Sequence, residues 1–297
     1  MIGSGILVMD KPQGFTSFDV IGKLRGILHM KRLGHTGTLD PMATGVLPVL
    51  IGTAARACDI LPDETKTYRA AFQLGAVTDT QDSTGNVLET HPFRASADDI
   101  LRILPQFTGE IQQIPPMYSA VQVGGRRLYE LARAGKEVER PARTVQVQQI
   151  ALTAFDPQTG AGTVEIICGK GTYVRTILHD LGQVLGCGAH MTALTRTAAC
   201  GFMLADAHDF ETVQRAADDG TIGSLVIPTD RLFAALPALY LNPAQTTLYR
   251  NGVRLSLTQL RDVPQAARCR VYAADQTFLG LADPDRGNGC LRIFKNL

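Results

Sequence analysis

Hydrophobic positions recur along the first two hundred residues with two spacings, and segments of each kind are interleaved. Continuous or alternating apolar stretches predict strands. They lie at 6–9, 46–51, 67–74, 145–155 and 163–168. Apolar residues at helical spacing predict helices. The first helix follows a capping Thr16 or Ser17, and another follows Ser96 and covers 98–104. Two more cover 128–134 and 173–185, and a shorter one covers 54–61.

Several of these strands follow one another with no helix between them. That order favours an α+β fold with a mixed, largely antiparallel central sheet flanked by helices and loops. Beyond residue 228 the pattern changes to prolines and short apolar patches separated by Gly, Asn and Asp. Such a pattern is typical of a small β-rich domain. We therefore expect two domains, 1–230 and 231–297.

Composition and charge exclude few classes of protein. The chain is 45% hydrophobic and 19% charged, with a formal net charge of +1. A nucleic-acid surface would therefore need basic residues gathered locally. The N-terminus has no basic leader, and no apolar run is long enough to span a bilayer, so we expect a cytoplasmic protein without membrane contact. Six cysteines without a Cys-x-x-Cys pair indicate reduced thiols.

Motifs for metal and nucleotide chemistry are missing from the sequence. There is no His-Glu-x-x-His, no Gly-x-Gly-x-x-Gly after a strand and no Gly-x-Ser-x-Gly. The segment Gly169–Thr172 lacks the upstream glycine and the Lys-Ser/Thr pair of a phosphate-binding loop. We therefore expect neither a metal nor a nucleotide cofactor.

The segment Gly34–Gly45 is a shaped loop with three glycines and one proline, and it carries His35 and Asp40. Glycine and proline select backbone conformations that other residues resist, so the loop has a defined path. An Asp before a Pro is also a common turn former, and the residues alone leave a catalytic loop and an ordinary turn both open. The same ambiguity holds for Tyr68 in a strand pattern and for Tyr173 and Arg175 near a helix start.

Taken in order, several segments resemble the TruB family of bacterial tRNA pseudouridine synthases. They are Asp10–Gly14, Gly34–Gly45, Lys66–Arg69, Ile114–Ala120, Gly171–Thr176, Gly186–His190 and Leu194–Arg196. The resemblance covers roughly residues 5–205, and it departs from the usual pattern at Thr38 and Gly169. The last sixty residues look like the small PUA-type RNA-binding domain of this family.

The resemblance implies an isomerase that converts uridine 55 in the T loop of tRNA to pseudouridine. The base would be flipped out, the glycosidic bond cut, the base rotated and rejoined through C5. This redox-neutral reaction needs no cofactor. The implied partner is the tRNA T arm, bound by a monomer without a guide RNA or a protein partner.

The resemblance also implies roles for individual residues. Asp40 would be the essential carboxylate, Arg175 its pairing cation and Tyr68 the ring that stacks on the target base. Tyr173 and Leu194 would lie beside the target nucleotide, and His35 would enter the RNA loop. Attack on the base, attack on C1′ and abstraction of a sugar proton all stay open as mechanisms.

Two basic clusters, Lys31 with Arg32 and Arg126 with Arg127, are either phosphate contacts or solvated surface charge. Two other functions compete with the leading one. The first is an RNA-binding or RNA-folding protein without catalysis, which has no need for a buried Asp–Arg pair. The second is a related synthase that acts on another RNA or with a guide RNA.

Overall fold

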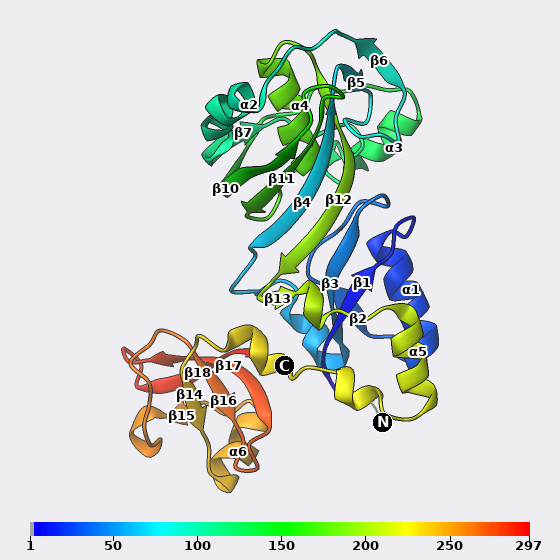
Figure 1. The fold of residues 1–297 in the computed structure, drawn as a ribbon. Helices are drawn as coiled ribbons and strands as arrows, with labels where there is room; N and C mark the ends of the chain where they lie inside the picture. The colour runs from blue at the N-terminus through cyan, green and yellow to red at the C-terminus, as the bar shows by residue number, and fades with distance from the viewer. Residues whose placement is uncertain (1–2) are drawn as a thin grey trace.

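A nine-stranded sheet forms the spine of the computed structural model, which describes residues 3–297 (Figure 1). Its strands are β1 (Gly5–Lys11), β2 (Leu33–His35), β3 (Thr44–Ile51), β4 (Lys66–Leu74), β7 (Gly109–Gln113), β10 (Arg143–Phe155), β11 (Ala161–Cys168), β12 (Ala189–Ala199) and β13 (Phe202–Met203). The main path runs β1-β3-β12-β4-β11-β10-β7, with β2 added to β3 and β13 to β12. Only β3 and β12 pair in parallel, among the pairs of this sheet. The predicted mixed, largely antiparallel sheet is confirmed.

Helices and two small hairpins surround this sheet. The helices are α1 (Ser17–Leu28), α2 (Ala97–Ile103), α3 (Leu128–Arg133), α4 (Val174–Val184), α5 (Phe210–Asp218) and, in the C-terminal part, α6 (Pro243–Arg250). The hairpins are β5 (Ala76–Thr78) with β6 (Val87–Thr90), and β8 (Gln122–Val123) with β9 (Arg126–Arg127). Short 3-10 helices occur at Gly52–Ala57, Leu104–Phe107, Leu204–Asp206, Ile222–Leu225, Thr229–Phe233 and Leu257–Gln259.

The helix ends follow from local sequence chemistry. Thr16 and Asp19 form a capping box at the start of α1, and Ser96 with Asp99 does the same for α2. Each box satisfies backbone N–H groups that have no partner inside the helix. Helix α4 ends before Gly186, whose φ of +74° belongs to the left-handed region that glycine tolerates.

Two local predictions need correction. The helix expected at 54–61 is a 3-10 helix at Gly52–Ala57. More importantly, no strand was predicted at 189–199, where β12 lies at the centre of the sheet. Register shifts at Met191/Ala193 and Arg196/Ala198 break the two-residue alternation that identifies a strand.

The C-terminal part is a second sheet of five strands, which confirms the predicted β-rich character. Its order is β14 (Ala238–Tyr240), β16 (Cys269–Tyr272), β17 (Phe278–Asp285), β18 (Cys290–Asn296) and β15 (Leu255–Ser256). This sheet contacts the N-terminal part of the chain at two places. The ring of Phe278 lies 6.3 Å from that of Phe233, and Lys295 forms an ion pair with Asp59 at 2.9 Å. A boundary between residues 230 and 231 stays a prediction.

The two halves of the large sheet meet where β3 lies beside β12. Only two residue pairs, Thr44 with Thr195 and Gly45 with Arg196, are in register there. Gly45 has a φ of +99°, and a Cβ on it would overlap the backbone oxygen of Arg196. A glycine is therefore required at this junction, because any side chain would force the strands apart.

We expect Gly45→Ala to lower the free energy of unfolding by roughly 2–4 kcal/mol, through backbone strain and steric overlap. The matched control is Gly26→Ala within α1, where no atom lies within 4 Å of the added Cβ. That control should raise stability by about 0.5–1 kcal/mol. Denaturant unfolding measures both, and equal stabilities for the two variants would contradict the assignment.

Candidate active site

Asp40 lies in the loop between β2 and β3, and the N-terminus of α1 fixes this loop. The backbone N–H of Leu39 donates to the buried Ser17 hydroxyl at 2.9 Å. The N–H of Ala43 donates to the carbonyl of Asp40 at 3.0 Å and closes a turn. These contacts hold the residues on both sides of Asp40, so the carboxylate projects from a defined backbone.

Lys11 is fully buried beneath this loop, and the sequence did not single it out. Its Nζ donates to the carbonyls of Pro12, at 3.0 Å, and Phe15, and it reaches the carbonyl of Pro41 at 3.4 Å. Burial lowers the pKa of Lys11 to about 8, although the negative charge of Asp40 opposes that shift. A lysine at the end of a buried strand, within the segment Asp10–Gly14, was the available signal.

Asp40 and Arg175 lie in contact although they are far apart in sequence. The Nη2 of Arg175 is 3.1 Å from Oδ2 of Asp40, and its Nη1 is 3.6 Å from Oδ2 of Asp82. Arg175 also donates to the carbonyls of Tyr118, at 2.7 Å, and Thr80, at 3.4 Å. One buried guanidinium thus connects two carboxylates and two loops, which restricts its orientation.

Asp82 is the member of this network that the sequence did not identify. It lies in the polar loop at 79–85, which the pattern indicated only as a turn. Its Oδ1 accepts from the hydroxyls of Thr80, at 2.8 Å, and Thr84. These contacts leave Oδ2 facing Arg175, so Asp82 is oriented before any substrate binds.

The carboxylate of Asp40 experiences opposing influences. Its side chain is 35% exposed, yet the surrounding protein removes enough water to raise its pKa above the ordinary value. The positive charges of Arg175 and Lys11 act against that rise, whereas the negative charge of Asp82 adds to it. The site therefore combines partial access for a ligand with a carboxylate that depends on its cations to stay ionised.

Tyr68 lies on the buried face of β4, between the two neighbouring strands of the sheet. It is in register with Ile166 of β11 and Arg196 of β12. Burial raises the pKa of its hydroxyl, and the adjacent Arg196 opposes the shift. Leu194 lies on β12, two residues before Arg196. It belongs with Tyr68 to the apolar cluster that also contains Leu39. The structure thus brings both predicted residues to the loop of Asp40.

Tyr173 is the residue before α4, two positions from Arg175. The side-chain amide of Gln113 makes two hydrogen bonds to its backbone, at 3.0 and 3.1 Å. The guanidinium carbon of Arg175 is 5.9 Å from the centre of the Tyr173 ring. Tyr173 therefore lies next to the guanidinium that pairs with Asp40, and its place beside a nucleotide stays a prediction.

His35 ends β2, where the loop begins. Its Nδ1 is buried and has no hydrogen-bond partner among residues 3–297. Burial, followed by the charge of Arg196, lowers the pKa of the imidazole below its usual value. The ring is therefore neutral at neutral pH, and within residues 3–297 it makes no hydrogen bond or ion pair with Asp40 or Arg175.

Arg196 is fully buried and forms hydrogen bonds to the backbone of the loop that carries Asp40. Its Nε donates to the carbonyl of Val46 at 2.6 Å, and its Nη2 donates to the carbonyl of Gly37 at 3.2 Å. It thereby fixes the backbone on both sides of Asp40. The sequence included Arg196 only as part of a family segment, with no role assigned to it.

The basic clusters at Lys31–Arg32 and Arg126–Arg127 are exposed, and their role as phosphate contacts stays a prediction. Residues 3–297 contain no group of three His, Cys, Asp or Glu side chains arranged to hold a metal ion. The six cysteines are free. No helix within the described chain is both long and apolar enough to cross a membrane.

Two protein-family models match the chain in succession. Residues 25–174 match the TruB family pseudouridylate synthase (N terminal domain), and residues 175–234 match the tRNA pseudouridylate synthase B C-terminal domain. A protein of Thiobacillus denitrificans named tRNA pseudouridine synthase B is 44% identical over 95% of this chain and 93% of its own length. One of the same name from Acaryochloris marina is 46% identical over 94% of each.

Solved structures share the fold at lower identity. The Cbf5–Nop10–Gar1 complex contains a chain with a TM-score of 0.70 and 24% identity, matched over 94% of this chain and 78% of that one. An H/ACA RNP bound to a substrate RNA containing 2'-deoxyuridine matches with a TM-score of 0.72 and 21% identity, over 98% and 84%. The arrangement of both sheets is therefore a known one.

Asp82→Asn should lower the pKa of Asp40, because it removes a negative charge that disfavours ionisation of the neighbouring carboxyl. The titration of Asp40 would consequently move to lower pH, and this can be followed by carbon NMR of the labelled carboxyl. Asp99→Asn, at the exposed cap of α2, should leave it unchanged. An upward shift in the Asp82 variant would contradict the electrostatic account.

Proposed function

The chain belongs to the TruB family of pseudouridine synthases, and we propose that it isomerises uridine 55 in the T loop of tRNA to pseudouridine. The observation that carries this proposal is the 3.1 Å contact between Asp40 and the buried Arg175, with Tyr68 in the adjoining apolar cluster. Relatives that share 40–46% of their residues with most of the chain are named as tRNA enzymes.

The target uridine must leave the stack of the T loop before any side chain can reach its glycosidic bond. We assign to His35 the task of occupying the vacated space in the RNA. A neutral imidazole can stack on a base and form hydrogen bonds at base edges, and the lowered pKa of His35 supports the neutral form.

Asp40 supplies the reactive carboxylate in this proposal. The reaction cuts the C–N glycosidic bond, rotates the uracil and forms a C–C bond through C5. Attack on the ring, attack on C1′ and abstraction of a sugar proton all begin from an ionised carboxylate. Arg175 therefore has the same task in each route: it keeps Asp40 charged and oriented where burial favours the neutral acid.

The flipped base would lie against Tyr68, with Leu194 and Tyr173 beside the nucleotide. Stacking of a base on an aromatic ring contributes about 1–3 kcal/mol. Because Tyr68 is only 7% exposed, its ring is held in place by the surrounding strands. Rigid placement of the base matters because the ring must rotate and rejoin without leaving the site.

We propose further that the protein acts in the cytoplasm as a monomer, on the T arm alone. The relatives named tRNA pseudouridine synthase B cover nearly the whole chain, which supports an enzyme that needs no guide RNA. A protein that only bound or folded RNA would have no need for a network in which Arg175 joins two carboxylates.

We expect Asp40→Asn to abolish pseudouridine formation, a loss of about 10⁴-fold or more, because an amide can serve as neither nucleophile nor base. Affinity for unmodified tRNA transcript should change little. Pseudouridine mapping should find one modified T-loop uridine with the wild-type protein and none with the variant. A wild-type protein that leaves the T loop unmodified would refute the proposal.

Tyr68→Ala should lower single-turnover rates far more than tRNA affinity, since one stacking contact is a small part of a large RNA interface. The control is Tyr240→Ala, which removes an exposed tyrosine of the second sheet. It should leave the single-turnover rate of pseudouridine formation on bound tRNA unchanged. Equal losses of rate and affinity at Tyr68 would contradict its assignment to the target base.

A further inference from the structure

A groove lies at the ends of strands β4, β7, β10 and β11 of the large sheet, beside the candidate active site. It consists of two neighbouring cavities, of about 390 and 110 Å³, which share Thr144, Val145 and Lys170 in their walls. The larger of them falls in the size range of ligand clefts, about 300–1,000 Å³. Of the residues in its walls, the sequence assigned a role only to Tyr173.

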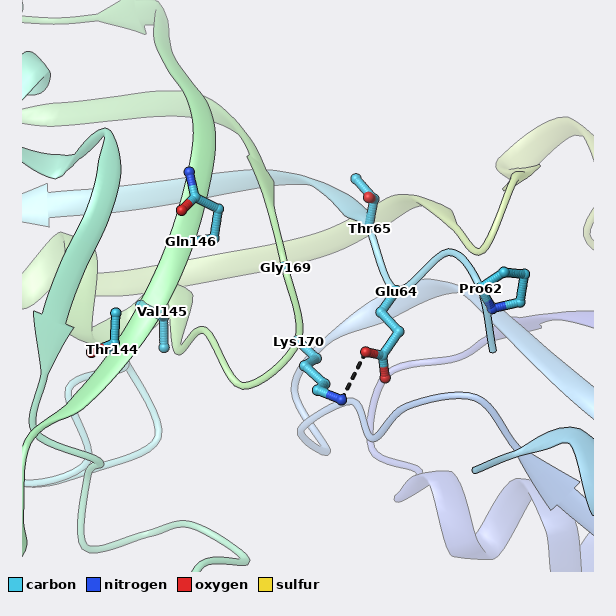
Figure 2. Close-up of a pocket in the computed structure, with 8 residues that line it drawn as sticks. All are labelled: Pro62, Glu64, Thr65, Thr144, Val145, Gln146, Gly169 and Lys170. Carbon is cyan, nitrogen blue, oxygen red and sulfur yellow. Dashed lines mark ion pairs between the residues drawn. The ribbon is translucent and has the colours of Figure 1, made fainter. Parts of the chain in front are cut away.

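The walls of the groove come from three separate segments. Figure 2 shows residues 144–146, near the start of β10, on one side and the segment 62–65 on the other. The β11–α4 loop lies between them and places Lys170 opposite Glu64 (Figure 2). At the narrower end the groove reaches Gln113 and Tyr173.

Both ends of the groove are tied to the candidate active site. Tyr173 lies two residues before Arg175, and its backbone is held by the buried amide of Gln113. At the other end, Glu64 and Thr65 lead directly into β4, which carries Tyr68. A chain lying in the groove would therefore pass beside the residues proposed to hold the target base.

The charged groups of the groove are exposed, and their ion pair costs little to break. Lys170 is 73% exposed and lies 2.8 Å from Glu64, and a pair this exposed contributes at most about 1 kcal/mol. The guanidinium of Arg143 makes no hydrogen bond or ion pair within residues 3–297. Hydroxyl and amide groups of Thr65, Thr144 and Gln146 line the rest. Cations with neutral hydrogen-bonding groups are the surface that binds phosphate and ribose.

We infer that this groove binds the sugar–phosphate backbone of the RNA strand next to the target uridine, with Lys170 and Arg143 facing phosphates. In the free protein the Glu64 carboxylate forms an ion pair with Lys170. When RNA binds, Lys170 leaves that carboxylate and pairs with an RNA phosphate. The inference rests on the proposed function for the identity of the RNA. It assigns to Glu64 the part of a competitor that weakens binding.

This competition predicts opposite effects for the two partners of one ion pair. Lys170→Gln should weaken binding of an unmodified T-arm hairpin about three- to tenfold and reduce the slope of log affinity against log salt by about 0.7. Glu64→Gln should strengthen binding about two- to fivefold, since Lys170 is then free. Lys170→Arg, which keeps the charge, should bind like the wild type.

Fluorescence anisotropy over a salt series measures these affinities, and thermal unfolding checks that each variant is folded. The matched controls are Arg215→Gln and Glu211→Gln, which break an exposed ion pair of 2.9 Å on α5 and should leave affinity unchanged. If both groove variants weaken binding, or neither differs from the controls, the inference is wrong.

The wild-type protein's conversion of the T-loop uridine is scored separately on the same hairpin. Conversion without the opposite shifts overturns the groove alone and leaves the proposed function standing. Opposite shifts without conversion support the groove as an RNA site and overturn the proposed function. A wild-type protein that does not bind the hairpin overturns both.

Discussion

The position of Asp40 depends on one buried guanidinium, that of Arg196. By donating to the carbonyls of Gly37 and Val46, it fixes the loop on both sides of the carboxylate. A buried cation is costly unless its hydrogens are satisfied, and two carbonyl oxygens supply part of that compensation. The Nη1 of Arg196 is buried with no hydrogen-bond partner among residues 3–297. The arrangement also ties the loop to β12, the strand that carries Leu194. The loop of Asp40 and the strand proposed to lie beside the target base are thereby held together.

Three buried cations surround the loop and act on different groups. Lys11 and Arg175 favour the ionised form of Asp40, whereas Arg196 favours the neutral form of His35. The same sign of charge thus maintains a negative carboxylate and an uncharged imidazole within one short segment. This division fits the two tasks proposed for Asp40 and His35, chemistry at the glycosidic bond and insertion into RNA, because only the first requires a charge.

Local patterns predicted the elements whose signals are local. Capping residues and apolar spacing were sufficient for α1, α2 and α4, and the consecutive strands indicated the antiparallel character of the sheet. Strand β12 was missed because two bulges interrupt its alternation. In the site, the family resemblance indicated Asp40 and Arg175. Asp82 was missed because a carboxylate in a threonine-rich turn has an ordinary local explanation, and its contact with Arg175 exists only in the folded chain.

The central place of β12 has a consequence for the order of events during synthesis. The guanidinium of Arg196 and the carbonyl that it holds at Val46 are 150 residues apart in the chain. A ribosome that adds about 5–20 residues per second therefore needs roughly 8–30 s between them. During that interval β1 and β3 have no partner on the β12 side, and the loop of Asp40 lacks its clamp. The nascent N-terminal segment is consequently the part of this protein that most needs protection from premature strand pairing.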